Sequence, residues 1–429
     1  MFHREQARRE PMPRKSTKST ALRETGILPV KCGTGIAPVP ASTKANPSLK
    51  SGWQRVRFGD VVRFVKEHAD PESGEFDRYV AGEHIETDNL HIRKWGTIGD
   101  GYLGPAFHRH FKKGQVLYGS RRTYLRKVAV AEFDGITANT TFVLEPSCDE
   151  LIPELLPFIM QTEAFNGHSV KQSKGSVNPY INFKDIAWFE FALPPKVEQR
   201  RIAEMLWAAD GAVESYRVCV KQQTNLVQAM SRDSFDHSKA TTTPLGEVGV
   251  WMSGGTPDRS NHAFWSGRIP WVSPKDMKVD VLMDAEEHIS EEALEQRSKL
   301  VEAGTIFIVV RGMILAHTFP VAVTGRPMAF NQDMKALRVS GDFDTKYVFH
   351  WLRHRARAIL GIASDSSHGT KRLPSEHLFG FGVPKPALAE QRQIAENLDR
   401  CNGAISDFQQ HIRRLEQMKK SLSAEFLGG

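Results

Sequence analysis

Two long stretches of the chain carry apolar residues at alternating spacings of four and three residues. The pattern runs over 202–230 and again over 394–422, and each run has one strongly polar interruption, Gln223 in the first and Lys419 in the second. This spacing is typical of a helix that buries one seam against another helix. Each seam could pack on its own domain, but two matched seams in one chain are more economically paired with each other. We therefore predict two long helices that pair in an antiparallel arrangement.

The two helical stretches belong to an internal duplication. Aligning Glu198-Gln199-Arg200 with Glu390-Gln391-Arg392 fixes a shift of 192 residues, and the same shift aligns the apolar positions of both helices. A segment of roughly 140 residues with short β-rich runs precedes each helix, for example at 141–144 and 305–310. These two segments have diverged far more than the helices. The order along the chain is therefore diverged module, matched helix, diverged module, matched helix.

This order predicts an α+β fold in which two similar mixed α/β domains are separated by an antiparallel pair of long helices with pseudo-two-fold symmetry. The expected parts are a disordered basic tail at 1–50, module 1 at 51–193, a first helical spacer at 194–236, module 2 at 237–383 and a second helical spacer at 384–429.

The formal net charge of +7 lies wholly in the tail. Residues 1–50 hold ten Lys and Arg against three Asp and Glu, so the rest of the chain carries no net charge. A nucleic-acid interface outside the tail must therefore rest on where charges cluster. The tail itself is rich in proline and lacks an apolar period, which fits a solvated extension, a start codon placed too early or a basic arm on nucleic acid.

The remaining composition narrows the class of protein. The four cysteines lie far apart without a C-x-x-C pair, and no apolar run reaches the length of a membrane span. We expect a cytoplasmic protein without structural zinc, a disulfide framework or membrane contact.

The best candidate for a nucleic-acid interface in module 1 is the stretch 101–131, which contains no Asp or Glu but many cations. A guanidinium binds O6 and N7 of guanine or a phosphate, whereas lysine mostly attracts phosphate. A polar loop before the first spacer is a second candidate. A solvated face is the alternative for both stretches. The candidate DNA-binding residues of module 1 are Arg109, Lys112, Lys113, Arg121, Arg122, Tyr124, Arg126, Lys127, Lys171, Lys174, Ser176 and Asn178.

Module 2 has a comparable acid-free stretch at 303–332. Asn and Gln side chains within it can pair bidentately with adenine. A glycine turn at 254–257 would let backbone approach DNA closely, although an ordinary turn explains it equally well. The candidate DNA-binding residues of module 2 are Thr256, Arg311, Asn331, Gln332, His368, Lys371 and Arg372.

Several segments carry a family resemblance. They are the paired P-P/P-K…E-Q-R-x-I-A-x-x-L segments that begin at Leu193 and Val383, the module openings R-F-G-D-V-V at 57–62 and P-L-G-E-V at 244–248, and S-G-G-T-P at 253–257. Together they resemble the specificity subunit of type I restriction–modification enzymes, in which two target-recognition domains alternate with helical spacers. The resemblance covers residues 53–429. Module 1 departs from it, because E-H-A-D-P stands at 67–71 in place of S-G-G-T-P.

The resemblance implies a non-catalytic subunit that reads a bipartite, asymmetric site in double-stranded DNA. It implies two modification (methyltransferase) subunits as partners and, in the larger complex, a restriction (endonuclease/translocase) subunit. S-adenosylmethionine, ATP and Mg²⁺ would then be bound by the partners, and this chain would hold no cofactor or metal. The partners would dock on the exposed helix faces together with Glu198, Gln199, Glu390 and Gln391. A 29-residue seam spans about 44 Å at 1.5 Å per residue, on the order of 13 base pairs.

Three stretches have the form of catalytic motifs without their context. N-P-Y at 178–180 lacks one proline of the N-P-P-Y motif of amino-methyltransferases, and no glycine-rich S-adenosylmethionine loop accompanies it. G-x-G-x-x-G at 99–104 is followed by Pro105 instead of a helix. P-D at 257–258 with D-M-K at 276–278 is a degenerate nuclease-like spacing. We expect no catalytic residue, and a stand-alone DNA-modifying or cleaving enzyme is the alternative function.

Overall fold

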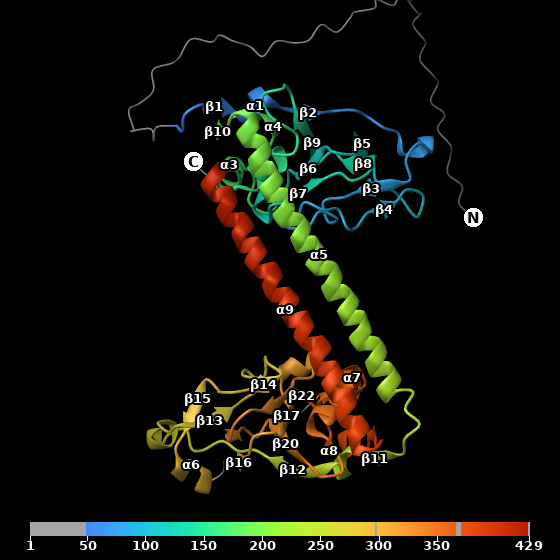
Figure 1. Ribbon diagram of the computed structural model, residues 1–429, viewed down its shortest axis with the longest axis vertical. Helices are drawn as coiled ribbons and strands as arrows, with labels where there is room; N and C mark the ends of the chain where they lie inside the picture. Colours follow the sequence, from blue (N-terminus) through green and yellow to red (C-terminus); the bar gives the residue numbers. More distant parts are fainter. Residues whose placement is uncertain (1–48, 297, 366–369, 428–429) are drawn as a thin grey trace, which may run out of the picture. The chain divides into compact units, whose positions relative to one another are not determined.

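The computed structural model (Figure 1) describes residues 49–296, 298–365 and 370–427. The tail predicted over 1–50 lies outside the described residues except at its end, and His368 lies outside them too. The contacts within the chain define two units. Unit 1 ends at Arg200 and also takes in Leu427, and unit 2 runs from Arg201 to Phe426.

Unit 1 is built around two four-stranded sheets. One has the strand order β2-β9-β6-β7 and is antiparallel throughout, whereas the other has the order β4-β3-β8-β5 with β3 and β8 parallel. β1 and β10 pair antiparallel and join the two ends of module 1. The strands are β1 Gln54–Arg57, β2 Val62–Val65, β3 Arg78–Val80, β4 Gly96–Thr97, β5 Phe107–Phe111, β6 Val116–Gly119, β7 Val128–Val130, β8 Gly135–Ala138, β9 Thr141–Pro146 and β10 Glu190–Leu193. The helices are α1 Phe58–Val61, α2 Leu156–Gln161, α3 Glu163–Gln172 and α4 Phe183–Ile186, with 3-10 turns η1 Pro71–Ser73 and η2 Thr123–Leu125.

Unit 2 also contains two larger sheets. A five-stranded sheet has the order β12-β20-β17-β18-β14, and a four-stranded sheet has the order β15-β13-β19-β16. β11 and β23 pair antiparallel and join the ends of module 2. The strands are β11 Thr242–Pro244, β12 Gly249–Ser253, β13 Ile269–Val272, β14 Val281–Leu282, β15 Glu287–Ile289, β16 Leu300–Val301, β17 Ile306–Val309, β18 Val321–Thr324, β19 Met328–Phe330, β20 Met334–Val339, β21 Ser364–Asp365, β22 Lys371–Arg372 and β23 Gly382–Pro384. The helices are α6 Glu291–Gln296, α7 Thr345–Leu360 and α8 Ser375–Phe379, with 3-10 turns η3 Leu245–Glu247, η4 His262–Trp265 and η5 Met313–Ala316.

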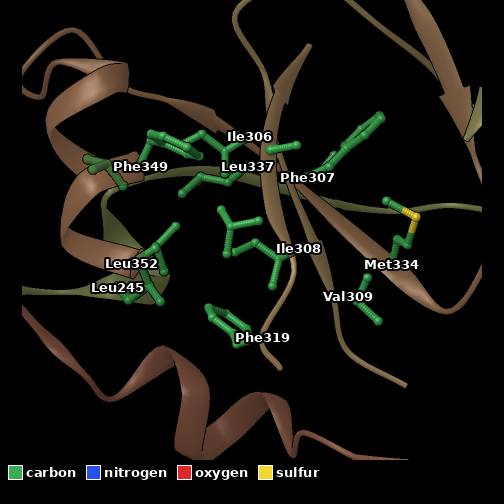
Figure 2. Packing of buried hydrophobic residues seen from close by; sticks show 14 of the residues in the cluster. Leu245, Ile306, Phe307, Ile308, Val309, Phe319, Met334, Leu337, Phe349 and Leu352 are labelled. Atoms are coloured by element: carbon green, nitrogen blue, oxygen red, sulfur yellow. The ribbon is translucent and has the colours of Figure 1, made fainter. Parts of the chain in front are cut away.

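The core of unit 2 forms where helix α7 covers the five-stranded sheet. All four residues of β17 are buried, as expected for a continuous apolar run of β-branched and aromatic residues. Figure 2 shows Phe349 and Leu352 of α7 near Ile306 and Ile308 of β17. A buried core of this kind fixes the strand that leads into the loop after β17, and that loop carries Arg311.

Unit 2 repeats the topology of unit 1. The order β12-β20-β17-β18 corresponds to β2-β9-β6-β7, and β15-β13-β19-β16 corresponds to β4-β3-β8-β5. The parallel pairing of β14 with β18 is matched in unit 1 by a single parallel bridge between His91 and Val130 of β7. The parallel pair recurs at matching residues, since Tyr79 faces Ile136 in unit 1 and Trp271 faces Ala329 in unit 2. The predicted repetition of one mixed α/β module is therefore confirmed within each unit. The pseudo-two-fold relation between the modules stays a prediction.

The two long helices form an antiparallel pair within unit 2. Helix α5 spans Lys196–Phe235 and helix α9 spans Leu388–Leu427. Lys419 Nζ of α9 lies 2.6 Å from Asp210 Oδ1 of α5, and the ring of His411 stacks on Tyr216 with centroids 5.2 Å apart. Residue numbers thus rise along α5 while they fall along α9 (Figure 1). The predicted antiparallel pairing is confirmed, and the seams do not pack on their own domains alone.

Candidate nucleic-acid interface

Each module presents an exposed arginine at the same point of its fold. Arg121 closely follows β6, forms an isolated bridge with Tyr180 and precedes η2. Arg311 closely follows β17, which corresponds to β6, forms a bridge with Arg372 and precedes η5. We call residues 120–125 and 310–316 the arginine turns. Arg121 and Arg311 therefore occupy one position in a repeated topology.

The arginine turn of module 1 borders an open cleft of about 670 Å³. Four cations line it: Arg63, Lys66, Arg121 and Lys184. No Asp or Glu is among its lining residues. Arg63 is ion-paired with Glu145, but in the described part of the chain the other three cations have no carboxylate partner. A cleft lined by one sign of charge focuses the field and attracts an anionic ligand such as the DNA backbone.

Two arginines predicted to bind DNA are instead used inside module 1. Arg109 is 9% exposed and its guanidinium carbon lies 4.7 Å from the ring centroid of Phe64. Burial lowers the pKa of Arg109. Arg126 donates to Asp88 at 2.6 Å and to Glu163 at 2.8 Å. Because Arg109 is buried against Phe64 and Arg126 is ion-paired, both arginines stabilise the fold of module 1. Neither is available to DNA in this conformation.

Three lysines of module 1 are also engaged by their neighbours. Lys112 Nζ lies 2.8 Å from a carboxylate oxygen of Glu67, and this pairing raises the pKa of Lys112. Lys174 Nζ lies 3.0 Å from Asp185. Lys127 donates to the carbonyl of Gly82. The first two pairs are on the surface, where an ion pair contributes little and can be exchanged for a phosphate.

Other candidates of module 1 are exposed, most of them near the arginine turn, whereas Lys113 lies at the other end of β6. Arg122 donates from Nε to Asn178 Oδ1 at 3.3 Å, and Tyr124 is 53% exposed. The loop with Lys174 folds back on itself, because Lys174 and Tyr180 exchange two backbone hydrogen bonds of 2.8 and 2.9 Å. The exposed candidates are Lys113, Arg121, Arg122, Tyr124, Lys171, Lys174, Ser176 and Asn178.

In module 2, as in module 1, some of the predicted DNA-binding residues are exposed and others are buried. Arg311 and Arg372 are exposed. Asn331 is only 6% exposed and its Oδ1 accepts the backbone N–H of Asp333 at 3.1 Å, so this amide closes a turn and does not face solvent. Gln332 is exposed and accepts a hydrogen bond from the hydroxyl of Thr256.

Lys371 forms a surface ion pair of 2.8 Å with Asp365 across the β21–β22 hairpin. Lys335, which lies near Arg372, was not among the residues predicted from the sequence to bind DNA. Burial, together with the charge of Arg372, lowers the pKa of Lys335. Lys66 and Lys184 of module 1 were missed as well, since they stand outside the acid-free stretch and reach the cleft only through folding.

The two glutamines predicted to bind partner subunits have a structural role instead. Gln199 is 1% exposed, and its amide bonds to backbone of Glu150, Ile152 and Pro194. Gln391 is fully buried and makes the matching set of bonds in module 2. Because both side chains anchor the start of a long helix, neither forms part of an exposed docking surface. Glu390 is exposed, and Glu198 is half-buried.

In the described part of the chain, no group of three His, Cys, Asp or Glu residues is arranged to hold a metal ion. Nor does any helix among the described residues combine the length and the apolar character that crossing a bilayer requires. The N-P-Y stretch at 178–180 serves as part of the hairpin behind the arginine turn.

The sequence matches a known protein family over most of its length. The profile described as "Type I restriction modification DNA specificity domain" matches residues 50–216 and 238–417. The EcoR124I/EcoR124II specificity subunit of Escherichia coli is 35% identical over 189 residues, which is 44% of this chain and 47% of that protein. The EcoDI specificity subunit of Escherichia coli is 26% identical over 196 residues, 45% of this chain and 43% of that protein. The chain thus spans about half the length of the curated relatives it matches.

Two solved structures share the fold. The S subunit of a type I restriction-modification system from M. genitalium aligns with a TM-score of 0.59 and 15% identity over 90% of this chain and 98% of that one. A chain from a study of complex assembly and conformational transition of the type I R-M system aligns with a TM-score of 0.53 and 20% identity, over 89% of this chain and 99% of that one. At these identities the likeness shows the fold alone.

Proposed function

We infer the function of this chain from its family: the chain belongs to the type I restriction modification DNA specificity family, whose profile matches it twice. We propose that it is the sequence-specific DNA-binding specificity subunit of a type I restriction–modification complex. One observation carries the proposal, namely that both modules present an exposed arginine at the same turn of the same topology, Arg121 and Arg311. Their surroundings differ, because Arg311 lies 3.9 Å from a carboxylate oxygen of Asp333, whereas Arg121 has no carboxylate partner among the described residues. The two modules are therefore suited to the two different halves of a bipartite, asymmetric site.

Within this proposal, Arg121 and Arg311 read bases, because a guanidinium can fork onto guanine in the major groove. Gln332 is suited to adenine for the same geometric reason. The exposed Lys171, at the end of α3, attracts phosphates. We keep 51–193 and 237–383 as the proposed bounds of the two target-recognition domains.

The test measures binding of the full chain to duplexes in which one half-site at a time is scrambled. We expect Arg121→Ala to weaken binding by about 5- to 100-fold and to remove discrimination in the first half-site only. Arg311→Ala should do the same for the second half-site. Arg413→Ala, an exposed arginine on α9, is the matched control and should bind as the unchanged chain does. Equal loss at both half-sites from Arg121→Ala would refute the assignment of one half-site to each module.

We further propose that the chain assembles with two modification subunits and, through the larger complex, with a restriction subunit in the cytoplasm. S-adenosylmethionine, ATP and Mg²⁺ would be bound by those partners. The exposed faces of α5 and α9, with Glu390 near the start of α9, are the proposed docking surface. The stand-alone enzyme is not favoured, because the matched family is a DNA specificity domain.

Incubating the purified chain with DNA, Mg²⁺ and S-adenosylmethionine tests this division of labour. We expect neither methyl transfer nor cleavage until modification subunits are added. Turnover by the chain alone would contradict the non-catalytic role.

A further inference from the structure

Arg122 holds a backbone conformation that favours glycine. Its φ is 50° and its ψ is 54°, which lie in the left-handed region. Residues other than glycine, asparagine and aspartate are strained there. The equivalent residue of module 2 is Gly312, whose φ of 137° and ψ of 160° lie in a different region, one that glycine adopts readily and other residues do not. The equivalence rests on hydrogen bonding, because the N–H of Arg122 donates to Pro179 O at 2.6 Å and that of Gly312 donates to Lys371 O at 2.9 Å. The topology therefore accepts glycine at this position.

The fold itself makes little use of the Arg122 side chain. The side chain is exposed, and its hydrogen bond to Asn178 is a solvent-exposed one of 3.3 Å. Within the described residues, Arg122 has no carboxylate partner. Arg126 provides the contrast, since it has a φ of 51° but its guanidinium bonds to Asp88 and Glu163. The side chain of Arg126 thus contributes two ion pairs to the module, whereas the side chain of Arg122 contributes only the exposed hydrogen bond to Asn178.

Residues in strained backbone conformations are held by the surrounding structure and cluster at functional sites. Arg122 stands next to Arg121, which lines the cationic cleft of module 1 together with Lys66 and Lys184. A guanidinium at this place adds to a field that attracts a phosphodiester backbone. The neighbouring Asn178 Oδ1 accepts from Nε, which leaves the terminal nitrogens of the guanidinium for an anion.

We propose that Arg122 is a DNA phosphate contact of module 1, kept in a strained conformation for that contact, and that module 2 has no equivalent because Gly312 stands there. This inference rests on the proposed DNA-binding function. On this inference, module 1 contacts the phosphodiester backbone of DNA through a side chain that module 2 lacks, so the two modules differ in phosphate contacts as well as in the bases that they read.

The test pairs stability with DNA binding in the full chain. Arg122→Gly and Arg122→Asn both suit left-handed backbone and remove the charge. We expect each to melt at the Tm of the unchanged chain or up to about 3 °C above it. Each should nevertheless bind DNA about tenfold more weakly, with the slope of log K against log salt reduced by about 0.9. Arg122→Lys should keep most of the affinity and the slope.

Arg126→Gly is the matched control, because the same backbone change there removes an ion-pair network and should lower the Tm. Three results would overturn the inference. Arg122→Gly could lower both Tm and affinity, as a purely structural role requires. It could bind DNA with unchanged affinity and slope, or relax one base position with an unchanged slope. If the unchanged chain binds no DNA, the proposed function fails and the inference fails with it, a result distinct from the other three.

Discussion

Gln199 and Gln391 each close a set of backbone hydrogen bonds at the start of a long helix. In module 2, Gln391 Nε2 donates to the carbonyls of Asp342 and Pro386, and its Oε1 accepts the N–H of Asp344 at 2.9 Å. These three hydrogen bonds are partly buried, so they satisfy backbone groups with limited access to water. Such groups cost about 1–3 kcal/mol each when left unsatisfied, so the glutamine fixes where α9 begins.

We predict that Gln391→Ala lowers the free energy of unfolding by about 2–3 kcal/mol, because it leaves backbone groups of module 2 without partners. Urea unfolding followed by circular dichroism measures this. Glu390→Ala, on the exposed neighbour, is the control and should stay within about 0.5 kcal/mol of the unchanged chain. Normal stability of Gln391→Ala together with loss of partner binding would instead favour a docking role.

The arginines of module 1 show what the sequence predicts and what it does not. Its acid-free stretch correctly indicated a local excess of positive charge around Arg121. It did not indicate that Arg126 would meet Asp88 and Glu163, which lie 38 and 37 residues away. Nor did it indicate that Arg109 would point into the core. Pairing and burial depend on tertiary contacts, and a linear stretch does not encode them.

At the scale of elements, the seam between α5 and α9 holds a buried ion pair. Lys419 was a polar interruption of an apolar pattern, and Asp210, outside that pattern, is its partner at 2.6 Å. Both side chains are largely buried, at 14% and 6% exposure. A buried pair contributes more to the choice of register than to net stability.

We predict that Lys419→Ala destabilises the chain by about 3 kcal/mol, because it removes one partner of a buried ion pair. The double variant Asp210→Ala with Lys419→Ala should lose less than the sum of the two single variants. Thermal or urea unfolding measures the coupling between the two sites. Strictly additive losses would show that the pair contributes no mutual interaction.

A second junction joins α7 to α9 through a buried histidine, His350. His350 of α7 lies 2.7 Å from Asp399 of α9, and burial lowers the pKa of this histidine although the carboxylate acts in the opposite direction. The unfolded histidine binds its proton near pH 6.5, whereas the folded one binds it only at lower pH. Below about pH 6.5 the unfolded state therefore takes up more protons, and stability falls.

We accordingly expect the chain to be less stable at pH 5.5 than at pH 7.5, with part of the difference lost in His350→Gln. Unfolding curves at both pH values measure the difference. An identical pH dependence in His350→Gln would show that other groups cause it.

Shortening the α5–α9 pair tests whether its length sets the gap between the two half-sites. Removing seven residues shortens a helix by about 10.5 Å, or roughly 3 base pairs. We predict that deleting 213–219 together with the facing 408–414 shortens the preferred gap between half-sites by about that amount. Binding to duplexes with graded gaps measures it. An unchanged preferred gap would exclude a role for the helix pair as a spacer.

At the scale of the whole molecule, the chain is one module-and-helix pattern used twice. The long helices and the duplication could be predicted because apolar periodicity over four heptads is a strong and local signal. The two-sheet construction of each module could not be predicted. Its strands are short, and pairs such as β3 with β8 join residues 57 positions apart, as Tyr79 with Ile136 shows.

The most direct test of the central claim, that two unlike modules read two unlike half-sites, is to map methylated motifs in the host genome with and without this gene. We predict one bipartite motif with two different halves and a fixed gap, lost on deletion and restored by the unchanged gene. With Arg121→Ala the restored motif should lose definition in one half only. A motif that persists without the gene, or one that is short and continuous, would contradict the account.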